Sequence, residues 1–88
     1  MDITINGSSI KTIADFHKTI KFILNFPDYY GENLDALWDC IRCIDLPCNI
    51  IWQDHKLSQS YLDTYFDKIH ELFDETEIAL QGFKVQYQ

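Results

Sequence analysis

Hydrophobic and polar residues alternate in three short stretches of the chain, a spacing typical of β-strands. Near the N-terminus, Ile3 and Ile5 alternate with polar neighbours, and Asn6-Gly7 predicts a turn after them. The apolar run 50–52 predicts a second strand, and the alternation over 83–87 predicts a third. These stretches are the only candidates for a sheet in the chain.

Helical spacing of apolar residues separates the strands. Thr12 has Asp15 three residues on, a variant of the capping box, and the residues that follow predict a helix that ends at about Asn25. After a proline and a short loop, Asn33 is a suitable N-cap for a second helix from Leu34 to about Cys43.

The segment 56–80 contains neither glycine nor proline and has a helical pattern throughout. Thr64 with Asp67 repeats the cap signature, which favours a short helix followed by a longer one, although one continuous helix would also fit the pattern. Gly82 closes this segment.

The resulting order is β-αα-β-αα-β within one domain, residues 1–88. Helical crossovers join parallel strands, so we expect an α/β fold with a three-stranded parallel sheet, four helices and right-handed connections. Helices must cover at least one face of such a sheet.

The charge of the chain narrows the class of partner. The formal net charge is −7, and the acids are concentrated in two segments, 25–45 with five acids and one base, and 71–83 with four acids and no base. The electric field of this negative charge repels nucleic acid and anionic membranes, which excludes them as partners, and favours a cationic protein.

No apolar run approaches the about 20 residues of a membrane span. The N-terminus lacks the features of a secretion signal, so we expect a cytoplasmic protein.

The predicted helix 34–43 has a buried and an outer side. If its apolar stripe faces the core, four residues share the outer side: Asp35, Trp38, Asp39 and Arg42. Asp39 is poorly placed for helix stability, because it is four residues from another aspartate and lies in the last turn, where the helix dipole opposes a negative charge. This placement suggests a binding residue. The alternative is a simple surface ion pair between Asp39 and Arg42.

Neither catalysis nor a cofactor emerges from the sequence. The two aspartates of this helix would lie on an exposed face, without a visible cleft to perturb their pKa values. Cys40 and Cys43 form a C-x-x-C motif, but at the end of a helix, where the dipole disfavours a thiolate. With Cys48, these thiols are interpreted as structural or incidental. A redox or zinc module remains an alternative, for which only the distant His55 offers a fourth ligand.

The segment from Pro27 to Cys40, PDYYGENLDALWDC, strongly resembles the signature of the barstar family, intracellular inhibitors of the secreted ribonuclease barnase. A weaker likeness covers the rest of the chain, including the stretch Phe73-Asp74-Glu75, and the order of elements agrees. The resemblance implies a protein that is monomeric when free and forms a 1:1 complex with a basic, barnase-like ribonuclease, without enzymatic activity or a cofactor.

The resemblance also implies a role for each site residue. Asp39 would occupy the position of the RNA phosphate, with Asp35 meeting a neighbouring cationic group. Tyr29 would pack on a catalytic histidine, and Trp38 would be an apolar anchor beside it. The complete expected site consists of Tyr29, Asn33, Asp35, Trp38, Asp39 and Glu75.

The chain departs from the family just after the second helix. Cys43 and Ile44 stand where the family tends to have a glycine and an aromatic residue, and the loop to Pro47 is one residue shorter. The Leu46–Pro47 bond could take either isomer. A second hypothesis is therefore a barstar-like module that binds another cationic protein without inhibiting a nuclease.

Overall fold

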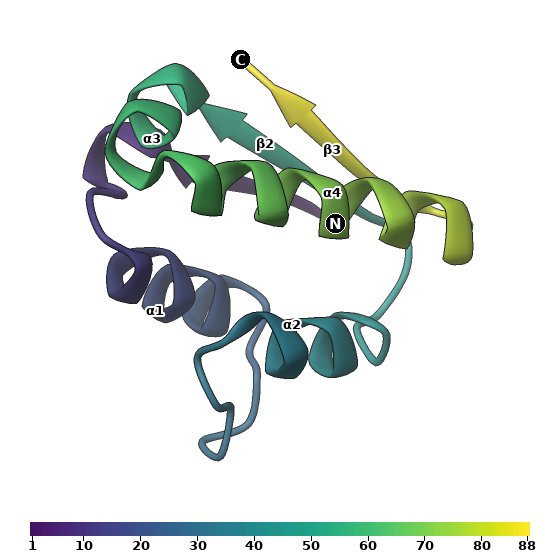
Figure 1. The fold of residues 1–88 in the computed structure, drawn as a ribbon. Helices are drawn as coiled ribbons and strands as arrows, with labels where there is room; N and C mark the ends of the chain where they lie inside the picture. Colours follow the sequence, from purple (N-terminus) through teal and green to yellow (C-terminus); the bar gives the residue numbers. More distant parts are fainter.

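Three parallel strands form one sheet in the computed structural model, which describes residues 1–88 (Figure 1). The strands are β1 (Asp2–Asn6), β2 (Cys48–Gln53) and β3 (Phe83–Tyr87), in the order β1-β2-β3. Both pairs are parallel. The predicted three-stranded parallel sheet is confirmed.

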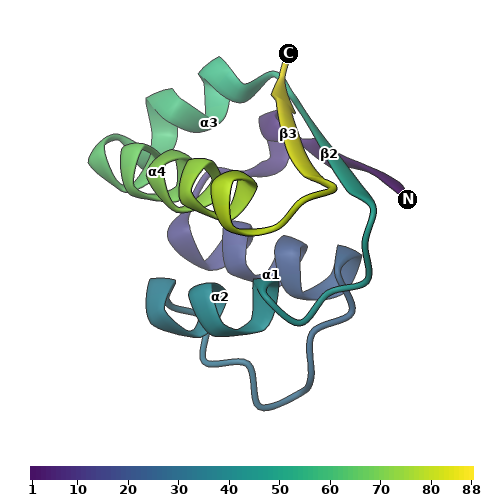
Figure 2. The same cartoon turned by 90° about the vertical axis from the view of Figure 1, so that its right-hand side faces the viewer.

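Four α-helices join the strands: α1 (Ile13–Ile23), α2 (Leu34–Ile41), α3 (His55–Leu62) and α4 (Thr64–Ala79). A short 3₁₀ helix, η1 (Gly7–Ser9), follows β1. The helices lie on one side of the sheet (Figure 2). The opposite side is mostly polar. The residues that face outward there form two rows across the three strands: Asp2, Asn49 and Lys84 in one row, and Thr4, Ile51 and Gln86 in the other. None of the helices is long and apolar enough to cross a membrane.

Two helix boundaries follow from local hydrogen bonds and backbone angles. The capping box is confirmed, because Thr12 Oγ1 accepts the Asp15 N–H at 3.0 Å and the Asp15 carboxylate accepts the Thr12 N–H at 3.1 Å. The first helix ends at Ile23 and not at Asn25, since Asn25 has φ 54° and cannot continue a right-handed helix. The second helix ends at Ile41, two residues before the expected Cys43.

The C-terminal helical segment is divided at Asp63, which has φ 54°. The short helix and longer helix predicted from the sequence are therefore confirmed, and the single continuous helix is wrong. The predicted cap is also wrong. Thr64 is the first residue of α4, and Asp63, in the N-cap position, makes no side-chain cap hydrogen bond.

The core lies between the sheet and the helices and centres on Trp52, which is fully buried. Its ring stacks on Phe16 at 5.5 Å and meets Phe66 edge-on at 5.2 Å between ring centroids. The indole N–H donates to Ser58 Oγ at 3.0 Å, and this hydroxyl donates to the Gly7 carbonyl at 2.8 Å. The central aromatic residue is thus bonded through α3 to the turn after β1.

Candidate protein interface

Asn33 fixes the entry of the chain into α2. Its side-chain oxygen accepts the Ala36 N–H at 2.8 Å, and its side-chain amide donates to the Gly31 carbonyl at 3.1 Å. The predicted N-cap is confirmed. One side chain therefore sets both the first turn of the helix and the loop in front of it.

Asp35 and Asp39 lie on the exposed side of α2, opposite the fully buried Leu37 and Ile41. The expected alternative, an ion pair of Asp39 with Arg42, does not form. The Arg42 guanidinium lies over the ring of Trp38 instead, with Cζ 3.7 Å from the ring centroid. The one close contact between a basic and an acidic side chain, His70 Nδ1 with Asp74 Oδ2 at 3.0 Å, lies within α4. The Asp39 carboxylate is therefore free to meet an external cation.

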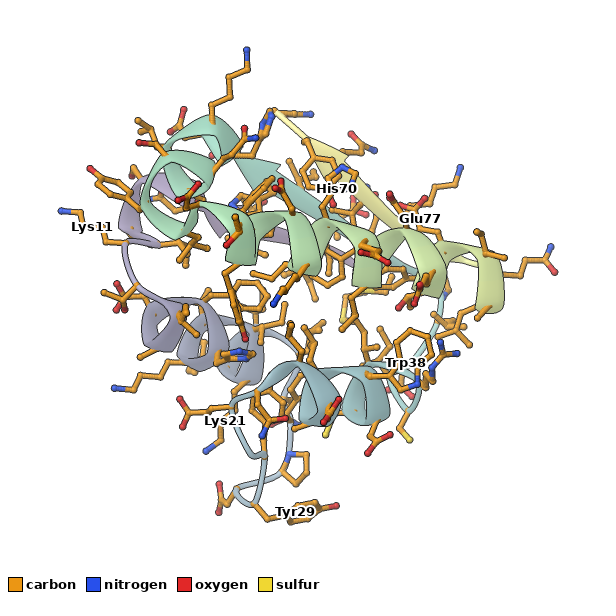
Figure 3. The ribbon with its side chains drawn as sticks, viewed as in Figure 1. Lys11, Lys21, Tyr29, Trp38, His70 and Glu77 are labelled. Atoms are coloured by element: carbon orange, nitrogen blue, oxygen red, sulfur yellow. The ribbon has the colours of Figure 1, made fainter.

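Trp38 lies on the side of α2 that faces α4 (Figure 3). The sequence placed it on the outer side with the aspartates, but it is partly buried and packs against the core. The reason is that α2 also packs against α4, so that a residue facing away from Leu37 is not fully in solvent. With Arg42 over its ring, Trp38 presents a limited surface rather than a free aromatic side chain.

The loop before α2 exposes one tyrosine and buries the next. Tyr29 lies at its tip, 86% exposed (Figure 3), whereas Tyr30 is buried. The hydroxyl of Tyr30 is 2.7 Å from His17 Nδ1 in α1, and the other ring nitrogen of His17 is 2.7 Å from the Tyr65 hydroxyl in α4. This histidine thus connects the loop to two helices and holds the base of the segment that presents Tyr29.

Burial keeps the imidazole and the two phenols of this network uncharged. Burial lowers the pKa of His17, against the opposing effect of the nearby Glu32 carboxylate. Burial also raises the pKa values of Tyr30 and Tyr65, so both phenols keep their protons. A neutral imidazole donates from one nitrogen and accepts at the other, so one hydroxyl accepts and the other donates.

Sequence reasoning placed His17 at the edge of the core or in solvent and did not find this network. His17 is in fact fully buried. Its burial could have been predicted from its position, since His17 falls within the same helical stripe as Ile13, Phe16 and Ile20. Its partners could not be found this way, because Tyr30 and Tyr65 reach it from other elements.

The buried histidine predicts a loss of stability in mild acid. Its pKa is lowered in the folded state, whereas the unfolded chain titrates near about 6.5. The contribution of neutral His17 to the free energy of unfolding is therefore fully present above about pH 6.5. It is lost as the pH falls below this value, by at most about 1.4 kcal/mol per pH unit for one proton. Urea denaturation at pH values from 7 to 5 measures this slope. His17→Gln, which cannot titrate, should flatten it, and an unchanged slope in this variant would contradict the assignment.

Glu75 is exposed on α4. Tyr65 contacts His17 of α1, and the buried Leu72, seven residues later, lies on the same side of α4. Glu77 lies on the opposite side, where its carboxylate accepts the Val85 N–H of β3 at 2.8 Å (Figure 3). Glu75 thus lies on a different side of α4 from Glu77, and its role as an acidic contact stays a prediction.

A pocket of about 580 Å³ opens beside Asp39, between the end of α2 and the loop after α1. Cys40 contributes to its wall, as do Cys43 and Ile44, the two residues at which the chain departs from the family. All three cysteines are free, and burial raises the pKa of Cys40. No group of three or more histidine, cysteine or acidic side chains is placed to hold a metal ion.

Comparison with known proteins identifies the family. The family model "Barstar (barnase inhibitor)" matches residues 1–88. The Bacillus subtilis (strain 168) protein named "Putative ribonuclease inhibitor YrdF" is 39% identical over 85 residues, which cover 94% of this chain and 93% of that protein. This match agrees with the resemblance seen in the segment 27–40. It also agrees with the three-stranded parallel sheet and the four helices. The chain belongs to the barstar family.

Proposed function

We propose that this protein is a stoichiometric inhibitor of a basic extracellular ribonuclease of the barnase kind, and that it acts in the cytoplasm of the cell that it protects. The observation that carries the proposal is the exposed Asp39 carboxylate, which no internal cation neutralises. Membership of the barstar family and the name of the Bacillus relative support it.

In this mechanism α2 and its preceding loop cover the nuclease active site. A site that binds the RNA phosphate must present cationic hydrogen-bond donors, and a carboxylate at the same position satisfies them. Charge-assisted hydrogen bonds of this kind are about twice as strong as neutral ones. The net charge of −7 accelerates the encounter with a basic enzyme.

The neighbouring residues complete the contact surface around this carboxylate. The exposed ring of Tyr29 offers a flat surface for a ring of the enzyme, while Asn33 holds the loop to α2. Asp35 and Glu75 add negative charge on both sides, and Trp38 supplies an apolar surface between α2 and α4. The protein itself carries out no reaction in this role.

The proposal predicts complete inhibition at equimolar protein. RNA cleavage by the cognate nuclease, followed by fluorescence of a labelled substrate, should fall linearly with added protein and reach zero at a 1:1 ratio. A ribonuclease of acidic net charge is the control and should remain active. If the protein binds a basic protein only in a strongly salt-dependent manner and cleavage continues, the second hypothesis, a module for another cationic partner, is the correct one.

A further inference from the structure

A second pocket, of about 360 Å³, lies between α3, α4 and the end of β3. Six residues line it, and none of them belongs to the expected nuclease interface: His55, Gln59, Phe66, Asp67, His70 and Tyr87. Figure 3 shows His70 between α4 and β3, whereas Trp38 lies on the side of α4 that faces α2. The pocket is at the carboxyl ends of β2 and β3, and open α/β sheets bind ligands outside the carboxyl ends of their strands.

Four rings form the walls of this pocket. His70 stacks on Tyr87 with ring centroids 4.5 Å apart, and His55 meets the same tyrosine edge-on at 5.6 Å. The buried Phe66 lies 6.3 to 6.4 Å from each of the other three ring centroids. Such walls pack against the methylene groups of a ligand, and the faces of phenylalanine and tyrosine attract a cation.

Contacts at Nδ1 orient both imidazoles. His55 Nδ1 donates to the Gln88 carbonyl at 3.0 Å, because a carbonyl can only accept. His70 Nδ1 lies 3.0 Å from an oxygen of the Asp74 carboxylate, which also accepts. A neutral imidazole that carries its proton on Nδ1 has an acceptor at Nε2. Nε2 is therefore the nitrogen that each of these rings has left for a ligand.

The charge around the pocket is negative. Asp67 is exposed and takes part in no ion pair, and neither lysine nor arginine lines the pocket. Burial raises the pKa of Tyr87, and the nearby carboxylates of Asp74 and Glu77 raise it further, so their charge also reaches this wall. The two histidines and Asp67 are not placed to hold a metal ion together. The pocket therefore favours an organic cation.

Acceptors, negative charge and aromatic walls together match one chemical group. A primary ammonium carries three N–H donors and a positive charge, and its alkyl chain packs along apolar surface. A quaternary ammonium lacks the donors, and an alcohol lacks the charge. We propose that this pocket binds the primary ammonium group of an alkylamine, which donates to the Asp67 carboxylate and to imidazole Nε2. This binding is additional to the proposed inhibitory function and does not depend on it.

The test is a titration of the free protein with n-butylammonium at about pH 8, where an ordinary imidazole is neutral, followed by the ring ¹H–¹³C NMR signals of His55 and His70. Butyltrimethylammonium keeps the charge and the stem without an N–H donor, and 1-butanol keeps the stem without the charge. We expect saturable shifts, with n-butylammonium binding at least about tenfold more tightly than either analogue. The ring of His17, fully buried elsewhere, is the internal reference and should not shift.

Two variants localise the binding. Asp67→Asn should weaken n-butylammonium several-fold without changing 1-butanol, and Gln59→Trp should fill the pocket and abolish the saturable shifts. Both residues are exposed, so the core is untouched by either substitution. Asp28→Asn, which removes an exposed acid from the loop before α2, is the matched control and should bind like the wild type.

Equal binding of butyltrimethylammonium would indicate a charge effect alone, equal binding of 1-butanol an apolar hollow, and shifts without saturation no site; each of these results overturns the proposal. An unchanged affinity of the Asp67→Asn variant does the same. Where the expected result is obtained, spermidine and N-acetyl-lysine methylamide distinguish a free polyamine from a lysine side chain of a protein as the source of the ammonium group, because the true source should bind more tightly. None of these measurements involves nuclease inhibition, so the two proposals can fail separately.

Discussion

Replacing Asp39 with alanine should weaken inhibition of the cognate ribonuclease by roughly 10²- to 10⁴-fold, because removing one partner of a desolvated charge pair costs about 3–5 kcal/mol. The cost arises largely in the enzyme, whose cationic groups would remain covered by α2 without a counter-charge. In the free protein the same carboxylate is exposed and has no ion-pair partner. The substitution therefore removes binding without removing an internal contact.

The inhibition constant, measured by titration of nuclease activity, checks this prediction. Asp39→Asn keeps the shape of the side chain and should lose most of the same affinity, which separates charge from packing. Glu71→Gln is the control for net charge. The Asp39→Ala protein should be slightly more stable than wild type, by a few tenths of a kcal/mol, because it loses the repulsion from Asp35 and the unfavourable dipole position. Undiminished inhibition by Asp39→Ala would refute the phosphate-mimic mechanism.

Replacing Trp52 with alanine should destabilise the fold by about 3–5 kcal/mol, a large part of the total for so short a chain. Trp52 is fully buried and touches aromatic rings from α1, α4 and β3: Phe16, Phe66, Phe73 and Tyr87. Its loss would leave a cavity at the point where the sheet meets the helices. Urea denaturation followed by far-UV circular dichroism measures the change.

Trp52→Phe is the graded control for this prediction. Phenylalanine keeps much of the aromatic packing but removes the indole N–H that donates to Ser58. Ser58 still donates to the Gly7 carbonyl, so its hydroxyl retains a partner. The phenylalanine variant should therefore lose clearly less stability than the alanine variant. Equal losses in the two variants would show that the hydrogen bond, not packing, dominates at this position.

The sheet could be predicted from the sequence because alternation and short apolar runs specify strands directly, and the helical crossovers fix their parallel arrangement. Helix ends were less predictable. Asn25 and Asp63 end or divide helices with positive φ angles, yet neither is a glycine, the residue that usually signals this conformation. Thr64 resembles a cap in the sequence but lies inside the helix, because Asp63 makes the turn.

The candidate site was predictable only where local physics singles out a residue. Asp39 stood out because the helix gains nothing from it, and its lack of an ion pair agrees with that reasoning. The neighbours of Trp38 and His17 depend on how distant segments pack. Arg42 covers one indole face, and Tyr65 reaches His17 from a helix 48 positions further along the chain. Spacing within one element carries no information about such contacts.

The face of the sheet that no helix covers is separate from both the core and the surface of α2. Thr4, Lys84 and Gln86 point away from every helix, so their side chains contribute neither to the buried core nor to the acidic surface of α2. Most parallel sheets have no such face, because helices cover both sides. A linker attached at Gln86 would therefore immobilise the protein with the helices directed away from the support.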